Sequence, residues 1–419
     1  MQTVDYRPLT VDFFIFSLQS FMSTKNNFPK IILKPKKERS LQNFHPWLFS
    51  GAIEKTEEGI EEGDIVEIYS NDRKYVATGH YHEGSIMVRV FSFQETDCQY
   101  EFWNDKLEKA FALRQQLGLT SNGTTNVYRL IHAEGDGLPG LIIDIYNTTA
   151  VIQTHTLGMH RIKNFLVDAL KNIYGNKLTA IYDKSAETMS KQGTAISVTN
   201  EFLFGKEENI EVIENGIRFF VDYETGQKTG FFIDQRENRQ LLSSYSKGKN
   251  VLNTFAYSGG FSMYALKAGA TLVHSVDSSK KVAEWAEKNT GLNFSNPPHR
   301  FFTEDVFDFM KKSETKYDVM VLDPPAFAKH LSSVDKATIG YRNLNQEAMK
   351  HIGKNGILFT FSCSQVIDKN LFRKIVFMAA LHAKRNVRIL HQLAQPADHP
   401  ISIYHPEGEY LKGLVLHVE

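Results

Sequence analysis

Two short runs near the C-terminus carry the residue types best suited to chemistry. Asp323-Pro324-Pro325-Ala326-Phe327 and Phe361-Ser362-Cys363-Ser364 each end an apolar segment that is typical of a buried parallel strand. Parallel sheets place ligands and chemistry at the carboxyl ends of their strands, so Asp323 and Cys363 are expected to face one crevice. An acid at a rigid Pro-Pro corner beside a thiol indicates methyl transfer to a nucleic-acid base, with Cys363 as the nucleophile.

A thiol has a specific use in cytosine chemistry. C5 of cytosine is a poor nucleophile, and a thiolate that adds to C6 makes C5 enamine-like and able to take a methyl group from a sulfonium donor. A base then removes the C5 proton and the thiolate leaves. Asp323 can donate or share a proton at ring N3. Lys329 is a candidate cation to lower the pKa of the thiol, which is ordinarily about 8.5.

Each of these residues also has a simpler interpretation. A cysteine at the end of a strand commonly behaves as a small buried hydrophobe, and by position alone that reading of Cys363 is favoured over a functional one. A Pro-Pro pair after a strand can be no more than a tight corner. The acid, the corner and the aromatic Phe327, which can stack on a flat ring, together exceed what a corner requires.

A glycine turn upstream predicts a cofactor that contains a nucleoside. The run from Asn253 to Phe261 ends a predicted strand and opens a helix, and Gly259 and Gly260 let the backbone approach a ligand closely. Asp277 closes the next predicted strand, where an acid can accept hydrogen bonds from ribose hydroxyls. The strict G-x-G-x-x-G fingerprint is absent, which favours S-adenosylmethionine over NAD. Asp305 is either a contact to an adenine amino group or a solvated loop acid.

Alternating strands and helices must position these candidate site residues. Apolar runs predict strands at residues 250–255, 271–277, 318–323 and 356–362, and amphipathic stretches predict helices between them, including 236–246 and 260–268. This alternation indicates a doubly wound α/β domain. Just before it, residues 217–223 and 230–234 are expected to form the two arms of a hairpin. Further upstream, a helix is expected at 159–174 within a central α+β unit, and short strands up to about residue 95 indicate a small all-β barrel.

The composition limits the possible classes of function further. The chain has 419 residues with 42% hydrophobic and 23% charged content, which is ordinary for a globular protein of two or three domains. Its 48 basic and 48 acidic residues cancel, so any RNA-binding surface must be a local patch. Two cysteines exclude a disulfide framework and a four-cysteine zinc site, and a free thiol nucleophile fits a reducing cytosol. The first 28 residues are expected to be a disordered extension.

One local patch is visible near the start of the barrel. Residues 30–43 are basic, and an aromatic run with Trp47 and Phe49 follows. Lysines and arginines can track an RNA backbone while aromatic rings stack on unpaired bases. A charged edge strand over a small aromatic core explains the same residues equally well.

Several motifs together resemble the cytosine-5 methyltransferases that act on the large-subunit (23S) ribosomal RNA. Besides the motifs above, the run from Gly226 to Arg239, Asp398-His399-Pro400, and the run from Pro406 to Gly413 match signatures of that group. The resemblance covers residues from about 30 to the end. It implies an N-terminal PUA barrel at 29–97, a central α+β domain at 98–205, and a Rossmann-like class I methyltransferase domain at 206–419.

The resemblance also implies functional residues. It places Cys363 at the nucleophile position of the family, with Asp323 beside it. The residues expected to hold S-adenosylmethionine are Phe255, Ala256, Tyr257, Ser258, Gly259, Gly260, Asp277, Ser278, Asp305, Asp323, Gln235 and Arg236. The residues expected to bind ribosomal RNA are Lys34, Lys36, Arg39, Trp47, Lys228, Phe327 and Lys329. No metal and no membrane contact are expected, the expected location is the cytoplasm, and a homodimer is left open.

Three other readings stay open. An RNA N-methyltransferase also suits Asp-Pro-Pro-aromatic, and that chemistry needs no thiol. A non-catalytic RNA-binding or ribosome-assembly factor would bind RNA without S-adenosylmethionine. A nicotinamide dehydrogenase is the most distant of the three, because the dinucleotide fingerprint is missing.

Overall fold

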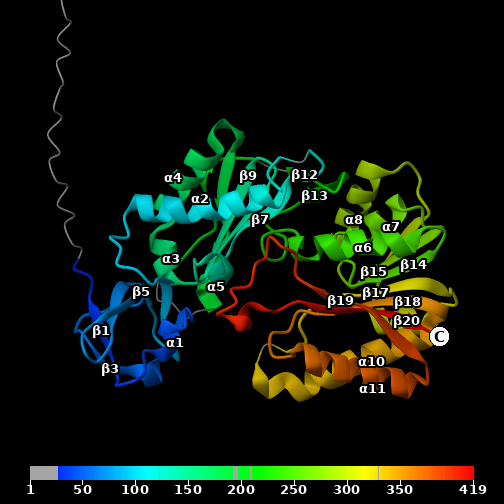
Figure 1. Ribbon diagram of the computed structural model, residues 1–419. Helices are drawn as coiled ribbons and strands as arrows, with labels where there is room; N and C mark the ends of the chain where they lie inside the picture. Colours follow the sequence, from blue (N-terminus) through cyan, green and yellow to red (C-terminus); the bar gives the residue numbers. More distant parts are fainter. Residues whose placement is uncertain (1–26, 122, 192–196, 208–209, 329) are drawn as a thin grey trace, which may run out of the picture.

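The computed structural model describes residues 27–121, 123–191, 197–207, 210–328 and 330–419, which form three successive units, each around its own sheet (Figure 1). The expected extension at 1–28 lies outside the described residues except for its last two, and so does Lys329. In the described ranges, no helix is both long and apolar enough to cross a membrane.

The first unit is a six-stranded sheet in the order β2-β6-β5-β4-β1-β3. Its elements are β1 (Lys30–Leu33), α1 (Arg39–Gln42), β2 (Trp47–Phe49), β3 (Ile53–Thr56), β4 (Ile65–Tyr69), β5 (Tyr75–Tyr81) and β6 (Ile86–Ser92). Alternating apolar side chains bury Ile31, Val66, Ile68 and Val88 in a small core of their own. The basic residues noted in the sequence lie on β1, on α1 and on the connection between them, and Trp47 and Phe49 belong to β2.

The second unit is a five-stranded sheet in the order β11-β10-β9-β8-β7. Its elements are α2 (Tyr100–Gln116), β7 (Val127–His132), β8 (Leu141–Tyr146), β9 (Thr149–Thr154), α3 (Leu157–Arg161), α4 (Lys163–Tyr174), β10 (Ala180–Asp183), α5 (Ala186–Lys191) and β11 (Glu201–Gly205). The single helix expected at 159–174 is instead α3 and α4, which meet at Ile162.

The third unit opens with a hairpin that the sequence prediction placed wrongly. β13 (Ile217–Val221) pairs with β12 (Ile210–Glu214), and residues 230–234 do not pair with it. The turn is Asn215-Gly216, and both residues adopt positive φ, 49° and 72°. Asn-Gly is the residue pair that a two-residue hairpin turn favours, because its backbone twist requires φ above zero at both positions.

A seven-stranded sheet forms the body of the third unit, in the order β16-β15-β14-β17-β18-β20-β19. Its strands are β14 (Asn250–Thr254), β15 (Leu272–Asp277), β16 (His299–Thr303), β17 (Tyr317–Leu322), β18 (Ile352–Ser362), β19 (Val387–Ala394) and β20 (Lys412–Val418). Its helices are α6 (Arg236–Ser246), α7 (Gly260–Lys267), α8 (Lys280–Asn293), α9 (Val306–Lys312), α10 (Val334–His351) and α11 (Lys369–Ala383).

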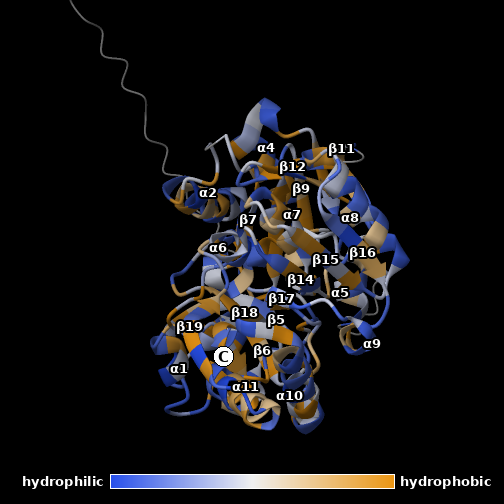
Figure 2. Cartoon of the chain, turned by 90° about the vertical axis from the view of Figure 1, so that its right-hand side faces the viewer, coloured by the Kyte–Doolittle hydropathy of each residue, from blue (hydrophilic) through white to orange (hydrophobic). Residues whose placement is uncertain are grey.

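Helices cover both faces of this sheet, with α6, α7 and α8 on one side and α10 and α11 on the other (Figure 1). The apolar residues of the sheet accordingly divide into two cores, one packed with α6 and α7 and the other with α9, α10 and α11. Hydrophobic colouring marks α7, while much of α8 is hydrophilic (Figure 2). The expected doubly wound α/β architecture is confirmed.

A long connection between β19 and β20, residues 395–411 and here called the arm, extends from the third unit to the first two units (Figure 1, orange to red). Asp398 anchors it: its carboxylate accepts two hydrogen bonds from Arg236, at 3.1 and 2.8 Å, and one from the backbone N–H of Arg129 at 3.0 Å. Burial opposes ionisation of Asp398, but His399 and Arg236 hold its pKa well below the usual range. The arm is therefore fixed by a buried ion pair.

We expect the Asp398→Ala variant to lose about 3–5 kcal/mol of unfolding free energy, because it leaves the Arg236 guanidinium buried without a counter-charge. Urea denaturation measures this loss. The matched control is Lys350→Met, which breaks the more exposed Lys350–Glu347 pair and should cost less than about 1 kcal/mol. Equal losses in both variants would contradict an anchoring role for Asp398.

Candidate active site

The carboxyl ends of parallel strands bring the predicted residues to one edge of the large sheet. β14, β15, β17 and β18 run parallel, and β14 and β17 are the neighbours between which the strand order reverses. Open α/β sheets bind ligands at such a switch point. The turn from Phe255 to Gly260 follows β14, Asp323 follows β17, and Cys363 follows β18.

The turn after β14 has a strained backbone. Phe255 and Tyr257 adopt φ of 53° and 45°, in the left-handed region, which costs a non-glycine residue about 1–3 kcal/mol. Two hydrogen bonds hold this shape: the N–H of Ala256 donates to the carbonyl of Val276 at 3.1 Å, and that of Tyr257 donates to Asp277 Oδ2 at 3.1 Å. Gly259, at φ 80°, then leads into α7. Strain of this kind is characteristic of ligand-binding turns.

Asp323 lies in a setting that favours its protonated form. Burial raises the pKa of Asp323 to about 7, with a contribution from the negative charge of Asp234, and Lys228, Gln235 and Arg239 only partly oppose it. A carboxyl with this pKa carries a proton on a substantial fraction of molecules at neutral pH. It can therefore donate a hydrogen bond or a proton to a ring nitrogen.

Beside Asp323 lie Asp234 and Tyr410, which were not given a role from the sequence, and Lys228, which was expected to bind RNA. Asp234 Oδ2 accepts hydrogen bonds from Lys228 Nζ at 3.1 Å and from the hydroxyl of Tyr410 at 2.8 Å. Burial opposes ionisation of Asp234, but Lys228, His399 and the Tyr410 hydrogen bond hold its pKa well below the usual range. Asp234 Oδ1 is buried and has no hydrogen-bond partner among the described residues. It is an acceptor available to a bound ligand.

Cys363 is partly exposed and lies in the same electrostatic environment. Burial raises the pKa of its thiol, Lys228 opposes that shift, and Asp323 and Asp234 add to it. Asp323 and Cys363 thus both sense the charges of Lys228 and Asp234. The sulfur is therefore partly accessible and lies close enough to Asp323 to sense its charge. The chemistry proposed from the sequence requires both conditions.

Other predicted cofactor residues have partners within the protein. Both oxygens of Asp277 accept backbone hydrogen bonds, from Tyr257 and from Ser279, which fixes the carboxylate at the end of β15. Ser278 beside it is exposed. Asp305 is exposed and caps α9, since its Oδ1 accepts from two N–H groups of the first turn. The guanidinium of Arg236 is occupied by Asp398, so it anchors the arm. Their contacts to a cofactor stay predictions.

The predicted RNA-binding residues are spread over two regions. Lys34, Lys36 and Arg39 are exposed on the connection from β1 into α1. Trp47 is half-buried: its Nε1 donates to Glu134 at 2.8 Å, and its ring lies 4.4 Å from that of His405 in the arm. Near the carboxyl ends of the parallel strands, the side chain of Lys228 is 45% exposed. Phe327 packs on Tyr341 at 4.5 Å, so its ring is partly committed to α10.

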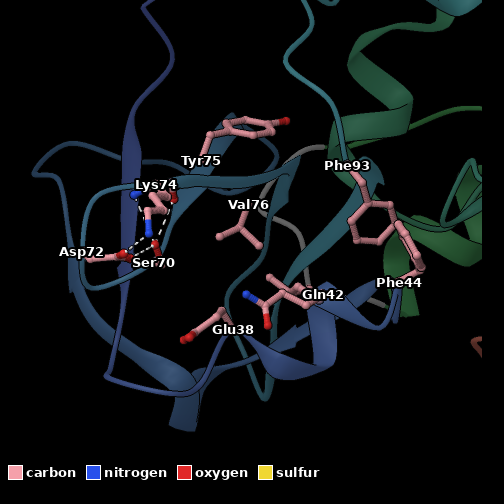
Figure 3. Close-up of a pocket in the computed structure, with 10 residues that line it drawn as sticks. Glu38, Gln42, Phe44, Ser70, Asp72, Lys74, Tyr75, Val76 and Phe93 are labelled. Carbon is pink, nitrogen blue, oxygen red and sulfur yellow. Dashed lines mark hydrogen bonds and ion pairs between the residues drawn. The ribbon is translucent and has the colours of Figure 1, made fainter.

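The first unit also contains a cavity of about 360 Å³ (Figure 3). Figure 3 shows the ion pair between Asp72 and Lys74 on one side of this cavity and the rings of Phe44 and Phe93 on the other. A second cavity, of about 530 Å³, lies where Tyr404 of the arm meets Phe44 and Lys106. Neither cavity is lined by the residues around Cys363.

The strand-end residues fit S-adenosylmethionine. Gly259 and Gly260 leave the start of α7 open to a ligand, Asp277 lies at the end of the adjacent strand, and the buried Oδ1 of Asp234 can accept from an amino group. A metal centre has no such support, because the described ranges contain no group of three histidine, cysteine or acidic side chains placed to hold an ion.

Comparison with known proteins extends this assignment. Residues 31–93 match the family model of a PUA-like domain, and residues 191–374 match that of S-adenosylmethionine-dependent methyltransferases. A solved putative S-adenosylmethionine-dependent methyltransferase from Streptococcus mutans has the same fold, with a TM-score of 0.79 at 22% identity over 93% of this chain and 100% of the other. A second solved structure, a putative methyltransferase complexed with SAH, gives a TM-score of 0.80 at 23% identity with the same coverage.

Curated relatives are closer in sequence. The ribosomal RNA large subunit methyltransferase I of Shewanella frigidimarina is 40% identical over 398 residues, covering 93% of this chain and 99% of the relative. The protein of that name from Aeromonas salmonicida is also 40% identical, over 92% of this chain and 98% of the relative. With its PUA-like domain and its methyltransferase domain for S-adenosylmethionine, the chain belongs to the ribosomal RNA large subunit methyltransferase I family.

Proposed function

We propose that this enzyme methylates C5 of a cytosine in large-subunit ribosomal RNA through a covalent adduct with Cys363. One observation carries the proposal: Cys363 and Asp323 follow adjacent parallel strands and sense the same charges, Lys228 and Asp234. The names of the curated relatives support the RNA substrate and methyl transfer. The position on the base rests on the thiol.

The protein's residues have distinct tasks in this reaction. The turn after β14, with Asp277 and Asp234, would hold S-adenosylmethionine, which would supply an electrophilic methyl group. The Cys363 thiolate adds to C6 of the cytosine while Asp323 donates or shares a proton at N3. C5 would then take the methyl group from the sulfonium, which would leave as the neutral thioether S-adenosylhomocysteine. A base removes the C5 proton, and expulsion of the sulfur with return of the N3 proton to Asp323 restores the ring and the thiolate. Because the target carbon is inaccessible in a stacked base, the cytosine must be unpaired or flipped.

The product of the reaction tests this proposal. Ribosomal RNA from a strain without this protein should lack one methyl group, and the purified wild type should restore it as 5-methylcytidine in nucleoside mass spectrometry. A methyl group on N4 or on a ring nitrogen would favour an RNA N-methyltransferase. Binding of RNA with no S-adenosylmethionine binding in calorimetry would favour a non-catalytic assembly factor.

The basic connection of the first unit gives a second test. We expect the triple variant Lys34→Gln, Lys36→Gln, Arg39→Gln to bind a ribosomal RNA fragment about tenfold more weakly, with a shallower salt dependence, because the lost charges contact phosphates. Filter binding at several salt concentrations measures both effects. The matched control is the double variant Lys247→Gln, Lys249→Gln. These exposed lysines precede β14 in the third unit, at the end of the large sheet opposite to Asp323 and Cys363. Unchanged affinity in the triple variant would exclude this RNA contact.

A further inference from the structure

Lys412 lies beside the nucleophile in the sheet. It opens β20, and it is the register partner of Ser362, the last residue of β18. Cys363 follows Ser362 directly, so the lysine and the cysteine lie at the same end of two hydrogen-bonded strands. The Lys412 side chain is buried, with 3% of the residue exposed, and its Nζ donates to the carbonyl of Ser364 at 2.6 Å. Lys412 therefore holds the turn that carries the sulfur.

The turn is held from its other side as well. Ser364 Oγ forms hydrogen bonds with the hydroxyl of Tyr341 at 3.1 Å and with the N–H of Ala328 at 3.4 Å. The backbone on the C-terminal side of Cys363 is thus tied to β20, to α10 and to the loop that follows Asp323. This arrangement fixes the sulfur relative to the acid.

A buried ammonium group normally requires a carboxylate, because leaving water is costly for a charge. Among the described residues, no acid lies within ion-pair distance of Lys412 Nζ. Burial lowers the pKa of Lys412 to about 8, and the largest opposing influence is Cys363, followed by Glu409 and Asp368, while Lys369 adds to the lowering. The fold tolerates this charge beside the sulfur.

A comparison with another buried lysine, Lys184, shows what differs in the surroundings of Lys412. Lys184 is 8% exposed, and its Nζ donates to the carbonyl of Gly226. The groups that oppose the lowering of its pKa are acids, Asp222, Glu187 and Glu224, whereas Cys363 leads for Lys412. Lys412 therefore differs from Lys184 in having the Cys363 sulfur, and not a carboxylate, as the leading group that favours its charge.

We propose that Lys412 is a positioning residue that holds the Cys363 turn and supplies the positive charge that stabilises the sulfur as a thiolate. This assignment rests on the proposed use of Cys363 as a nucleophile. Burial and the negative charges of Asp323 and Asp234 resist ionisation of the sulfur, while Lys228 assists it. Lys412 adds a second cation. When the thiol proton leaves, and again when the thiolate is expelled from the product, its ammonium offsets the negative charge on sulfur.

The reactivity of Cys363 in the full-length protein tests this without any RNA. Iodoacetamide alkylation followed by peptide mass spectrometry gives the rate at Cys363 from pH 6 to 10. Cys98 is the only other cysteine in the sequence; it is 4% exposed, and burial raises the pKa of its thiol to about 12, so it serves as an unreactive internal control. Lys412→Met should shift the midpoint of the Cys363 profile upward by at least about one pH unit, and slow alkylation about tenfold at pH 8.

Matched variants separate charge from packing. Lys412→Arg keeps a charge and should keep the wild-type midpoint, whereas Lys412→Gln, which can still donate to the Ser364 carbonyl, should shift as Lys412→Met does. Lys369→Met removes a nearby but 51% exposed charge and should leave the profile unchanged. If Lys412→Met does not fold, Lys412→Gln carries the test. An uncharged variant that alkylates as fast as the wild type, or an Arg variant as slow as Lys412→Met, overturns the assignment.

The same measurements distinguish this inference from the proposed function. If the alkylation profile shifts as expected but methyl transfer survives Cys363→Ala, Lys412 still controls the sulfur and the cytosine mechanism is wrong. If methyl transfer requires Cys363 but no Lys412 variant changes its alkylation, the mechanism stands and the role of Lys412 falls.

Discussion

Methyl transfer to RNA is expected to fall by at least about 1,000-fold when Cys363 is replaced by alanine, while binding of S-adenosylmethionine is unchanged. Without the sulfur there is no addition to C6, and C5 is too weakly nucleophilic to take the methyl group. Cys363 is only partly buried and follows the last residue of β18, so the substitution removes little packing. Transfer of a radioactive methyl group to ribosomal RNA, with calorimetric titration of S-adenosylmethionine, measures the two effects separately.

Cys98→Ala is the control for this experiment. Its sulfur is buried in the core of the central unit beside Trp103, whose Nε1 donates to the Cys98 carbonyl at 2.9 Å, and its removal should affect stability alone. Cys363→Ser is the stricter companion, because a hydroxyl keeps the shape and lacks the nucleophilicity. Full activity in either Cys363 variant would remove the covalent mechanism and favour methylation of a nitrogen.

Asp323→Asn is expected to lower methyl transfer by about 100-fold or more and, above pH 7, to make the protein more stable. The activity falls because the amide cannot donate a proton at N3. The stability rises because the wild type must ionise a carboxyl whose pKa burial has raised to about 7. In the unfolded chain the same group titrates near about 3.9, so folding retains a proton between about pH 4 and 7, and stability falls as the pH rises through that window.

The size of the effect follows from that window. Asp323→Asn should gain about 2–4 kcal/mol of unfolding free energy above pH 7, progressively less toward acid, and almost nothing below about pH 4. Urea denaturation at pH 4, 6 and 8 tests the trend. Asp335→Asn, an exposed acid in the first turn of α10, should show no such pH-dependent gain. A variant that is less stable than the wild type at pH 8 would contradict the raised pKa.

The positions of Asp323 and Cys363 at the ends of strands could be predicted because buried parallel strands are recognisable in the sequence. Apolar runs without polar alternation located β14, β15, β17 and β18 to within a few residues, and α6 was predicted with its observed bounds, 236–246. Once those strands are known, the parallel topology brings their carboxyl ends together. Asp323 and Cys363 are then expected at the same edge of the sheet without any knowledge of long-range contacts.

Side-chain partners could not be predicted in the same way. Arg236 was expected to contact the cofactor, but it pairs with Asp398, far along the chain, and Arg239 pairs with Glu214 across the start of the domain. The wrong hairpin has a local cause: the glycines at 226 and 230 suggest a turn there, but Asn215-Gly216 is the stronger hairpin signal. Lys412 did carry a signal. It is a charged residue between the apolar Leu411 and Leu414, at a position that the sheet buries.

The arm has a consequence for how a substrate is selected. One continuous segment touches the first unit through Tyr404 and Phe44, whose rings are 5.2 Å apart, and reaches the catalytic edge through the hydrogen bond from Tyr410 to Asp234. Asp398 fixes the middle of the arm to the second unit through Arg129 and to the third unit through Arg236. These contacts therefore hold the basic patch and the sulfur at a defined span. Under the proposed function, this defined span would direct the enzyme to the cytosine that lies at the matching distance from RNA bound at the basic patch.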